Sequence, residues 1–190
     1  MTNTFISVDE HVQEHPEVWT KRLSQAKWGE RIPHVAKNGD GKERWLIDGR
    51  EIALDGVADC GAMMAQRAIN PHCWSDVPAA VYDPAERLKT LDAAGIEYAV
   101  LYPTVAGVAG QNFGRIDDAE LELACVQAYN DWLLEEWSSF SPRFVPQCLV
   151  PLSPIDSTVH EIRRCVARGH RGVIYPSIPM ELRDLPHIND

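Results

Sequence analysis

The sequence predicts an α/β fold in which four parallel strands form one half of an eight-stranded barrel. Four short apolar runs have the continuous apolar character of buried parallel strands. Three amphipathic segments with helix caps alternate with these runs, as in βαβ units. After the fourth run the 190-residue sequence passes into a proline-containing stretch without a complete helix, whereas a finished open sheet would cover its last strand. A small open sheet is the alternative.

Each predicted strand is an apolar run with a clear end. The first run, Phe5–Val8, passes into polar residues. Tyr98–Tyr102 is closed by Pro103, and Gly172–Tyr175 is closed by Pro176. We therefore expect parallel strands, adjacent in sequence order, near residues 5–11, 98–102, 144–149 and 172–175.

The predicted helices begin at capping residues and end at glycines or polar turns. Asp83 is the N-cap of the first helix, Pro84 is its first residue, and Glu86 completes a capping box. Gly95 ends this helix. The same pattern predicts helices over 117–137 and 153–169, with Asp117 and Ser153 as N-caps and with Val159, Ile162 and Val166 facing the core.

A long segment between the first strand and the first helix, about residues 13–81, interrupts the alternation. It is rich in tryptophan, proline, glycine and charge, and Asp48-Gly49 is a two-residue hairpin signal between two short runs. We interpret it as an irregular insertion within one domain portion, residues 1–190. Its tryptophans would form either a lid over a substrate or a small core of their own: Trp19, Trp28, Trp45 and Trp74.

Charge and cysteine content exclude several classes of protein. The net charge of −10 argues against binding to nucleic acid or to an anionic membrane surface, both of which need a basic face. The N-terminus lacks the features of a signal peptide, and no apolar run is long enough to span a membrane. Five cysteines without a C-x-x-C pair indicate reduced, mostly buried thiols. We therefore expect a cytoplasmic protein with a small-molecule partner.

Two side chains at the end of the first strand are the candidate metal ligands. Asp9 and His11 are two residues apart, so they share one face of a strand, with Glu10 on the other. A carboxylate and an imidazole suit Zn²⁺, although this spacing alone also fits a solvated strand end. The string from His11 to His15 matches the H-x-x-E-H peptidase motif, but Pro16 disfavours the helix that this motif needs.

Several segments resemble one enzyme family in the same order. Residues Ile6–Glu14 resemble the opening strand of amidohydrolase-superfamily enzymes, in particular the aminocarboxymuconate-semialdehyde decarboxylase-like branch, also called amidohydrolase family 2. The resemblance covers most of the chain and is weakest over 20–80. The other segments that carry it are Tyr82–Leu88, Gly95–Thr104, Tyr129–Leu133, Arg143–Pro146 and Gly169–Val173.

The resemblance implies a (β/α)₈ TIM-type barrel with one divalent metal ion, usually zinc, and Asp9 and His11 as its first ligands. The branch completes its site with histidine on middle strands and an aspartate on the eighth strand, for which these 190 residues hold no counterpart. We therefore expect a fragment, the N-terminal half of the barrel, that lacks the catalytic residues and binds zinc weakly or not at all alone. The remaining histidines are expected at the surface: His34, His72, His160, His170 and His187.

Four further residues are candidates for substrate binding because they follow strands whose carboxyl ends would surround an active site. Glu14 would orient either a ligand or the loop after the first strand, or would be a solvated carboxylate. Tyr102 and Thr104 end the second strand, and Tyr175 ends the fourth. Tyr102 fits a packing role equally well.

The function implied is that of a metal-dependent carboxy-lyase or hydrolase acting on a small aromatic or muconate-like carboxylic acid, with decarboxylation favoured. In a hydrolase the metal would lower the pKa of bound water, and in a decarboxylase it would stabilise the charge that develops as CO₂ leaves. The alternatives are a non-catalytic remnant and a small α/β binding domain without a metal site. The sequence does not determine the identity of the substrate or of the metal. It does not determine the oligomeric state either, and a homo-oligomer is compatible with it.

Overall fold

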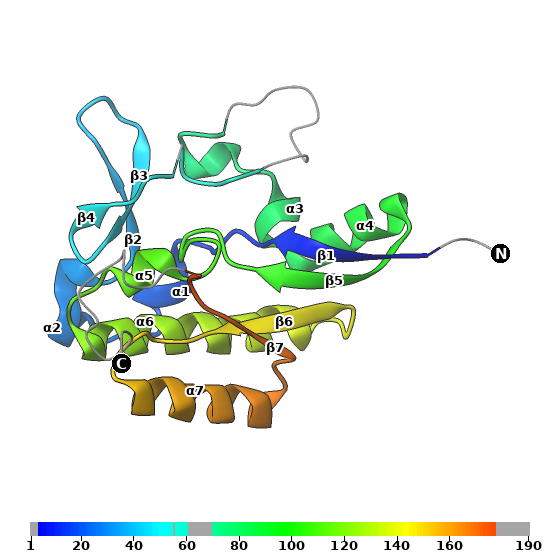
Figure 1. Ribbon diagram of the computed structural model, residues 1–190. Helices are drawn as coiled ribbons and strands as arrows, with labels where there is room; N and C mark the ends of the chain where they lie inside the picture. The colour runs from blue at the N-terminus through cyan, green and yellow to red at the C-terminus, as the bar shows by residue number, and fades with distance from the viewer. Residues whose placement is uncertain (1–3, 55, 61–69, 178–190) are drawn as a thin grey trace.

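The computed structural model describes residues 4–54, 56–60 and 70–177. Its main sheet has four parallel strands, which curl into half of a barrel (Figure 1). The predicted half-barrel and its strand order are therefore confirmed, whereas His187 and the tail beyond Ser177 lie outside the described residues. The strands, in sheet order, are β1 (Phe5–His11), β5 (Ile96–Tyr102), β6 (Phe144–Leu149) and β7 (Gly172–Ile174).

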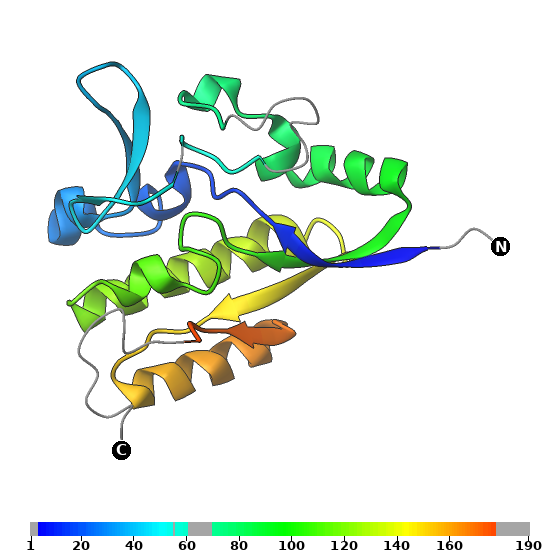
Figure 2. The ribbon, with the colours of Figure 1, turned by 45° about the horizontal axis from the view of Figure 1, so that its top comes forward.

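A helix precedes each of the last three strands. α4 (Pro84–Ala94) precedes β5, α6 (Ala119–Trp132) with its π-helical extension Leu133–Ser138 precedes β6, and α7 (Ile155–Arg168) precedes β7. Figure 2 shows α4 beside β1 and β5, and α7 beside β6 and β7. In the described ranges no helix is both long and apolar enough to cross a bilayer.

The insertion is more regular than predicted. β2 (His34–Lys37), β3 (Glu43–Ile47) and β4 (Arg50–Glu51) form an antiparallel sheet, and Asp48 and Gly49 make the predicted turn with φ of 52° and 71°. With α5, the insertion lies at the carboxyl ends of β1 and β5 (Figure 1). The short helices are α1 (Glu17–Thr20), α2 (Gln25–Trp28), Gly29–Arg31, Trp74–Asp76, α3 (Ala79–Tyr82) and α5 (Gln111–Gly114).

The insertion shares the core of the main sheet. Trp19 and Trp45 are buried and pack edge to face at 5.7 Å, and Trp19 also packs against Phe113 at 5.6 Å. The Trp19 Nε1–H donates to the carbonyl oxygen of Cys125 on α6 at 3.0 Å. These two tryptophans therefore form neither a lid nor a separate core, and they tie the insertion to the body of the domain.

Two predicted helix starts are corrected. The N-cap of α6 is Asp118, not Asp117, because the Asp118 carboxylate accepts from the backbone N–H groups of Glu120 and Leu121 at 3.0 and 3.2 Å. α7 begins after Pro154, which offers no side-chain cap. The Asp83 cap of α4 is as predicted.

The face of α7 that packs against the rest of the protein carries a buried carboxylate, that of Glu161. Val159 and Val166 are 37% and 59% exposed, so the prediction that they face the core is wrong, whereas Ile162 is partly buried and packs against the buried residues Cys148, Val150 and Cys165, as predicted. The buried residues of the helix are Glu161 and Cys165. Burial of a carboxylate is tolerated only where its oxygens are bound, and α6 supplies partners for them.

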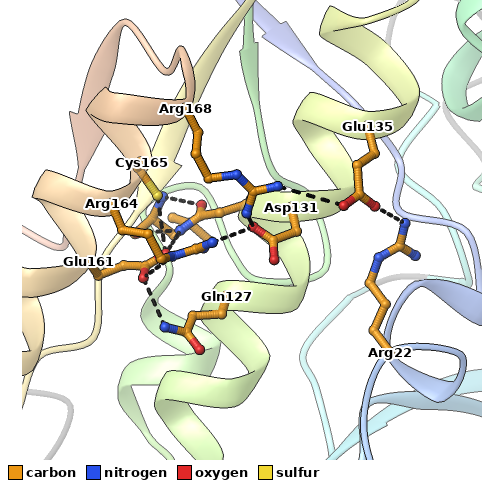
Figure 3. A network of polar contacts seen from close by, with 10 residues as sticks. Arg22, Gln127, Asp131, Glu135, Glu161, Arg164, Cys165 and Arg168 are labelled. Carbon is orange, nitrogen blue, oxygen red and sulfur yellow. Dashed lines mark hydrogen bonds and ion pairs between the residues drawn. The ribbon is translucent and has the colours of Figure 1, made fainter.

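A network of polar side chains joins α6 to α7 (Figure 3). Glu161 accepts hydrogen bonds from Asn130 at 2.8 Å and from Gln127 at 3.1 Å. Arg164 binds both oxygens of Glu161, at 2.7 and 2.8 Å, and also pairs with Asp131. Burial alone would raise the pKa of Glu161, but these hydrogen bonds together lower it, so the carboxylate stays charged inside the protein.

Asn130 connects this network to the carboxyl end of β6. Its buried side-chain amide accepts from the N–H of Leu149 and donates to the carbonyl oxygen of Leu149, both at 2.9 Å. Leu149 also pairs with Ile174 of β7, so Asn130 adds two hydrogen bonds to a residue that is already part of the sheet. Asn130 therefore holds the end of β6 in position against α6.

One histidine, His170, and most of the cysteines are buried. His170 is only 4% exposed, so its predicted surface position is wrong. The backbone N–H of His170 donates to the carbonyl oxygen of Cys165, and this hydrogen bond turns the chain inward after α7. Burial lowers the pKa of the His170 imidazole to about 4. All five cysteines are free and four are buried, which agrees with the predicted reduced thiols.

Replacing Asn130 tests its role at the end of β6. We expect Asn130→Ala to lower the free energy of unfolding by about 3 kcal/mol, because it removes the side-chain partner of the N–H and C=O of Leu149 and one of the buried hydrogen bonds to Glu161. Gln127→Ala, which removes a single partly buried hydrogen bond to Glu161, should cost about 1 kcal/mol or less. Urea unfolding of both variants measures the difference, and equal losses would contradict this role.

Candidate functional site

The carboxyl end of β1 places Asp9 and His11 together. Asp9 Oδ1 lies 3.5 Å from His11 Nε2, whereas Glu10 points away and pairs with Arg87 at 2.7 Å. The two side chains meet on one face of the strand, as their spacing predicts. Asp9 is 80% exposed and His11 33% exposed, so both can be reached by a ligand from solution.

The imidazole of His11 is oriented by the loop after β5. His11 Nδ1 lies 2.8 Å from the carbonyl oxygen of Pro103. A carbonyl oxygen can only accept, so Nδ1 carries the proton in this contact. In the neutral form of such a ring the lone pair lies on Nε2, which faces Asp9. Metal-binding histidines have this arrangement, in which the second ring nitrogen donates to a carbonyl or carboxylate.

The H-x-x-E-H peptidase interpretation does not hold. Residues 12–15 are not helical, so His11 and His15 are not brought to one side of a helix. The ring of His15 instead packs edge to face against Trp74 at 5.2 Å. Glu14, the acid of that motif, is turned into the protein.

Glu14 orients the loop after β5. Its side chain is buried, and its oxygens accept from the backbone N–H groups of Thr104, Val105 and Ala106 at 3.2, 2.8 and 3.4 Å. Burial raises the pKa of Glu14 to about 7, although these three hydrogen bonds oppose the rise. Because the bound N–H groups follow Pro103 directly, Glu14 also fixes the carbonyl that accepts from His11.

Arg87 holds the same strand end from the other side. Its guanidinium, in a side chain that is 2% exposed, donates to the Glu10 carboxylate at 2.7 Å and to the carbonyl oxygens of His11 and Ala80 at 2.9 and 2.6 Å. This role of Arg87 was not predicted from the sequence. Arg87 lies four residues before Leu91 and therefore shares the apolar face of α4. This spacing could have indicated that the arginine is buried.

A cavity of about 370 Å³ opens beside His11. The end of β1, the insertion and the loop after β5 form its walls, at the carboxyl ends of the strands, where the barrel enzymes of known mechanism carry out their chemistry. Its lining residues are His11, Ala53, Leu54, Asp59, Pro103, Thr104, Gly107, Val108, Gln111, Asn112 and Arg115.

The four candidate substrate-binding residues lie in different places. Thr104 lines the cavity, and its buried hydroxyl has no hydrogen-bond partner among the residues described. The ring of Tyr102 lies 6.0 Å from that of His11, centre to centre. Glu14 is buried behind the loop, and Tyr175, 63% exposed, follows the end of β7. Of the four, Thr104 alone is on the cavity wall.

The donor atoms of Asp9 and His11 suit a zinc ion but make only part of a site. Zinc accepts a carboxylate oxygen and an imidazole nitrogen, and the second nitrogen of His11 is already bound to Pro103. Within the described ranges, however, histidine, cysteine and carboxylate side chains do not gather in any group of three that could hold a metal. Further ligands would have to come from elsewhere.

Replacing Glu14 tests its buried ionisation. The pKa of Glu14 rises from 4.5 to about 7 on folding, so between these values the folded state holds a proton that the unfolded state has lost. The resulting stability is present below about pH 4.5 and lost as the pH rises through about 7. We expect the unfolding free energy of the wild type, minus that of Glu14→Gln, to fall by about 3 kcal/mol between about pH 5 and about pH 8.

The control for this measurement is Glu97→Gln, which removes an exposed carboxylate on β5. For that variant the difference from the wild type should stay constant over the same pH range. A constant or rising difference for Glu14→Gln would show that the Glu14 carboxyl is not destabilised by burial.

The fold matches solved structures of amidohydrolases and decarboxylases. An amidohydrolase from Mycobacterium avium subsp. paratuberculosis K-10 aligns with a TM-score of 0.65 and 24% identity over 91% of this chain and 49% of that one. 2,6-Dihydroxybenzoate decarboxylase from Rhizobium aligns with a TM-score of 0.53 and 20% identity over 90% of this chain and 38% of that one. IDCase from Metarhizium anisopliae, in its apo form, aligns with a TM-score of 0.59 and 15% identity over 97% of this chain and 46% of that one. The chain thus spans half or less of the length of each.

The sequence itself matches a family model. No curated protein sequence matches the chain. The model described as amidohydrolase matches residues 10–187, which is nearly the whole chain and includes every segment that carries the resemblance from residue 10 onward. The chain therefore belongs to the amidohydrolase family.

Proposed function

We propose that this chain supplies the first two metal ligands, Asp9 and His11, of a metal-dependent carboxy-lyase or hydrolase that acts on a small aromatic carboxylic acid. One observation carries the proposal. His11 donates through Nδ1 to Pro103 at 2.8 Å, which leaves Nε2 beside the Asp9 carboxylate at the edge of a cavity. This is the pre-oriented donor set that a zinc ion needs from the first strand of such an enzyme.

The residues around this pair have positioning roles in the proposal. A bound zinc would act as a Lewis acid toward an oxygen of the substrate or of water. Glu14 fixes the loop whose carbonyl orients His11, and Arg87 fixes the backbone of His11 itself. The remaining ligands and the acid or base that moves the proton would come from outside the described residues.

Decarboxylation of an aromatic acid is favoured over hydrolysis. The chain shares its fold with a decarboxylase whose structure has also been solved in complex with 2,6-dihydroxybenzoate, a small aromatic carboxylate. The cavity beside His11, about 370 Å³, falls in the size range of small-molecule sites.

We also propose that the protein is cytoplasmic, because a reducing compartment suits its free cysteines.

Metal analysis tests the proposed ligands. We expect the purified chain to bind added zinc reversibly and to retain less than one zinc per chain after dialysis, because two protein ligands hold zinc weakly. Asp9→Asn and His11→Asn should abolish this binding. Asparagine at position 11 can still donate to the Pro103 carbonyl oxygen but lacks the Nε2 ligand.

The matched control is His160→Ala, which removes an exposed histidine on α7 and should leave zinc binding unchanged. Zinc binding that survives both Asp9→Asn and His11→Asn would place the metal elsewhere and overturn the proposal. One tightly held zinc per chain would show that the site is complete within these residues.

Sedimentation tests the exposed faces of the half-barrel. Large apolar side chains are exposed on both edge strands of the sheet, and we expect them to drive self-association or poor solubility of the 190-residue chain. A monomer at all accessible concentrations would contradict this expectation. The exposed residues are Phe5 (59%), Ile6 (62%), Val8 (67%) and Val173 (40%).

A further inference from the structure

Two of the polar side chains that line the cavity are used to build its wall. Gln111 accepts from the N–H of Ala109 at 2.9 Å, and Asn112 donates to the carbonyl oxygen of Val105 at 2.9 Å. Gly107 allows the wall to close, because a Cβ atom there would lie 2.6 Å from the side chain of Gln111. The loop after β5 is thus a fixed surface, and each of these two amides uses one hydrogen bond to hold it.

Arg115 differs from these residues. It is exposed, it lines the same cavity as His11, and among the described residues its guanidinium forms no ion pair. Within the described part of the chain its guanidinium makes one hydrogen bond, a donation from Nη1 to the carbonyl oxygen of Gln111 at 3.2 Å. Asp59 also lines the cavity and has an interaction partner of its own. Most N–H groups of Arg115 therefore remain available to a ligand.

The hydroxyl of Thr104 is a second unsatisfied group on this wall. It is buried, and it has no hydrogen-bond partner among the residues described. A buried hydroxyl without a partner is costly, so a ligand or water that reaches it would be stabilised. The cavity therefore presents the free guanidinium of Arg115 and the His11 imidazole, whereas the Thr104 hydroxyl is covered by the protein.

We propose that Arg115 is the carboxylate-binding residue of this cavity. The proposal rests on the function proposed above, because it assigns the substrate's acid group to a side chain. A planar guanidinium binds a carboxylate through two parallel hydrogen bonds, which fixes the plane of an attached aromatic ring as well as its charge. Held in this way, the ring would extend across the cavity toward His11.

Calorimetric titration of the full 190-residue chain without metal tests this assignment. The probes are 2,6-dihydroxybenzoate, its neutral amide 2,6-dihydroxybenzamide, and inorganic phosphate. We expect Arg115→Met to weaken binding of the carboxylate at least about tenfold, and Arg115→Lys to weaken it less, while binding of the amide is unchanged. Phosphate should bind more weakly than the carboxylate. Arg163→Met, which removes an exposed arginine on α7, is the matched control.

Each other outcome contradicts the assignment. Equal loss of carboxylate and amide binding in Arg115→Met would mean that Arg115 only shapes the cavity. Unchanged carboxylate binding, tighter binding of phosphate, or no binding of the carboxylate by the wild type would each exclude the proposed subsite. Failure of the proposed function is seen separately, since it would abolish zinc binding at Asp9 and His11 while the Arg115-dependent affinity for the carboxylate persists.

Discussion

The buried guanidinium of Arg87 fixes where β1 ends, and the candidate site depends on that position. β1 is an edge strand that pairs with β5 on one side only, and its register with β5 shifts between Ser7 and Glu10. Arg87 spans this irregular end by binding the Glu10 side chain, the His11 carbonyl and the chain at Ala80. Burial lowers the pKa of Arg87 and Glu10 opposes this effect, so the ion pair offsets the cost of placing a cation in the interior. Losing one partner of such a buried pair typically costs about 3–5 kcal/mol.

A second restraint acts on the opposite face of the same strand end. Glu14 binds three consecutive N–H groups after Pro103, and the carbonyl of Pro103 in turn accepts from His11. The backbone of His11 is therefore held from the α4 side and its ring from the β5 side. The restraint has a cost, because a carboxylate that is buried without a cation has a pKa near neutrality. Burial of the Glu14 carboxylate therefore lowers the stability of the folded protein, but it fixes the loop that orients the His11 imidazole.

The parts of the fold that follow from local rules could be predicted from the sequence. Continuous apolar runs predicted all four parallel strands, Asp48-Gly49 predicted the hairpin, and the two-residue spacing predicted that Asp9 and His11 would meet. The errors arose where long-range contacts override local pattern. The valines of α7 looked like a core-facing stripe, but the buried face of this helix is set by Glu161 and the partners that α6 brings to it. The roles of Arg87 and of the Pro103 carbonyl depend on neighbours more than 70 positions away in the chain.

These contacts hold His11 with Nδ1 protonated and with Nε2 beside Asp9, and the candidate site depends on this orientation. Nitrogen-15 NMR of the histidine side chains reads this directly, because the two tautomers of a neutral imidazole give distinct nitrogen shifts and ring-proton couplings. At about pH 9, where imidazoles are ordinarily neutral, we expect His11 to show a single Nδ1–H tautomer, with the exposed His160 as an averaging reference. An Nε2–H tautomer, or averaging of His11 like that of His160, would contradict the account.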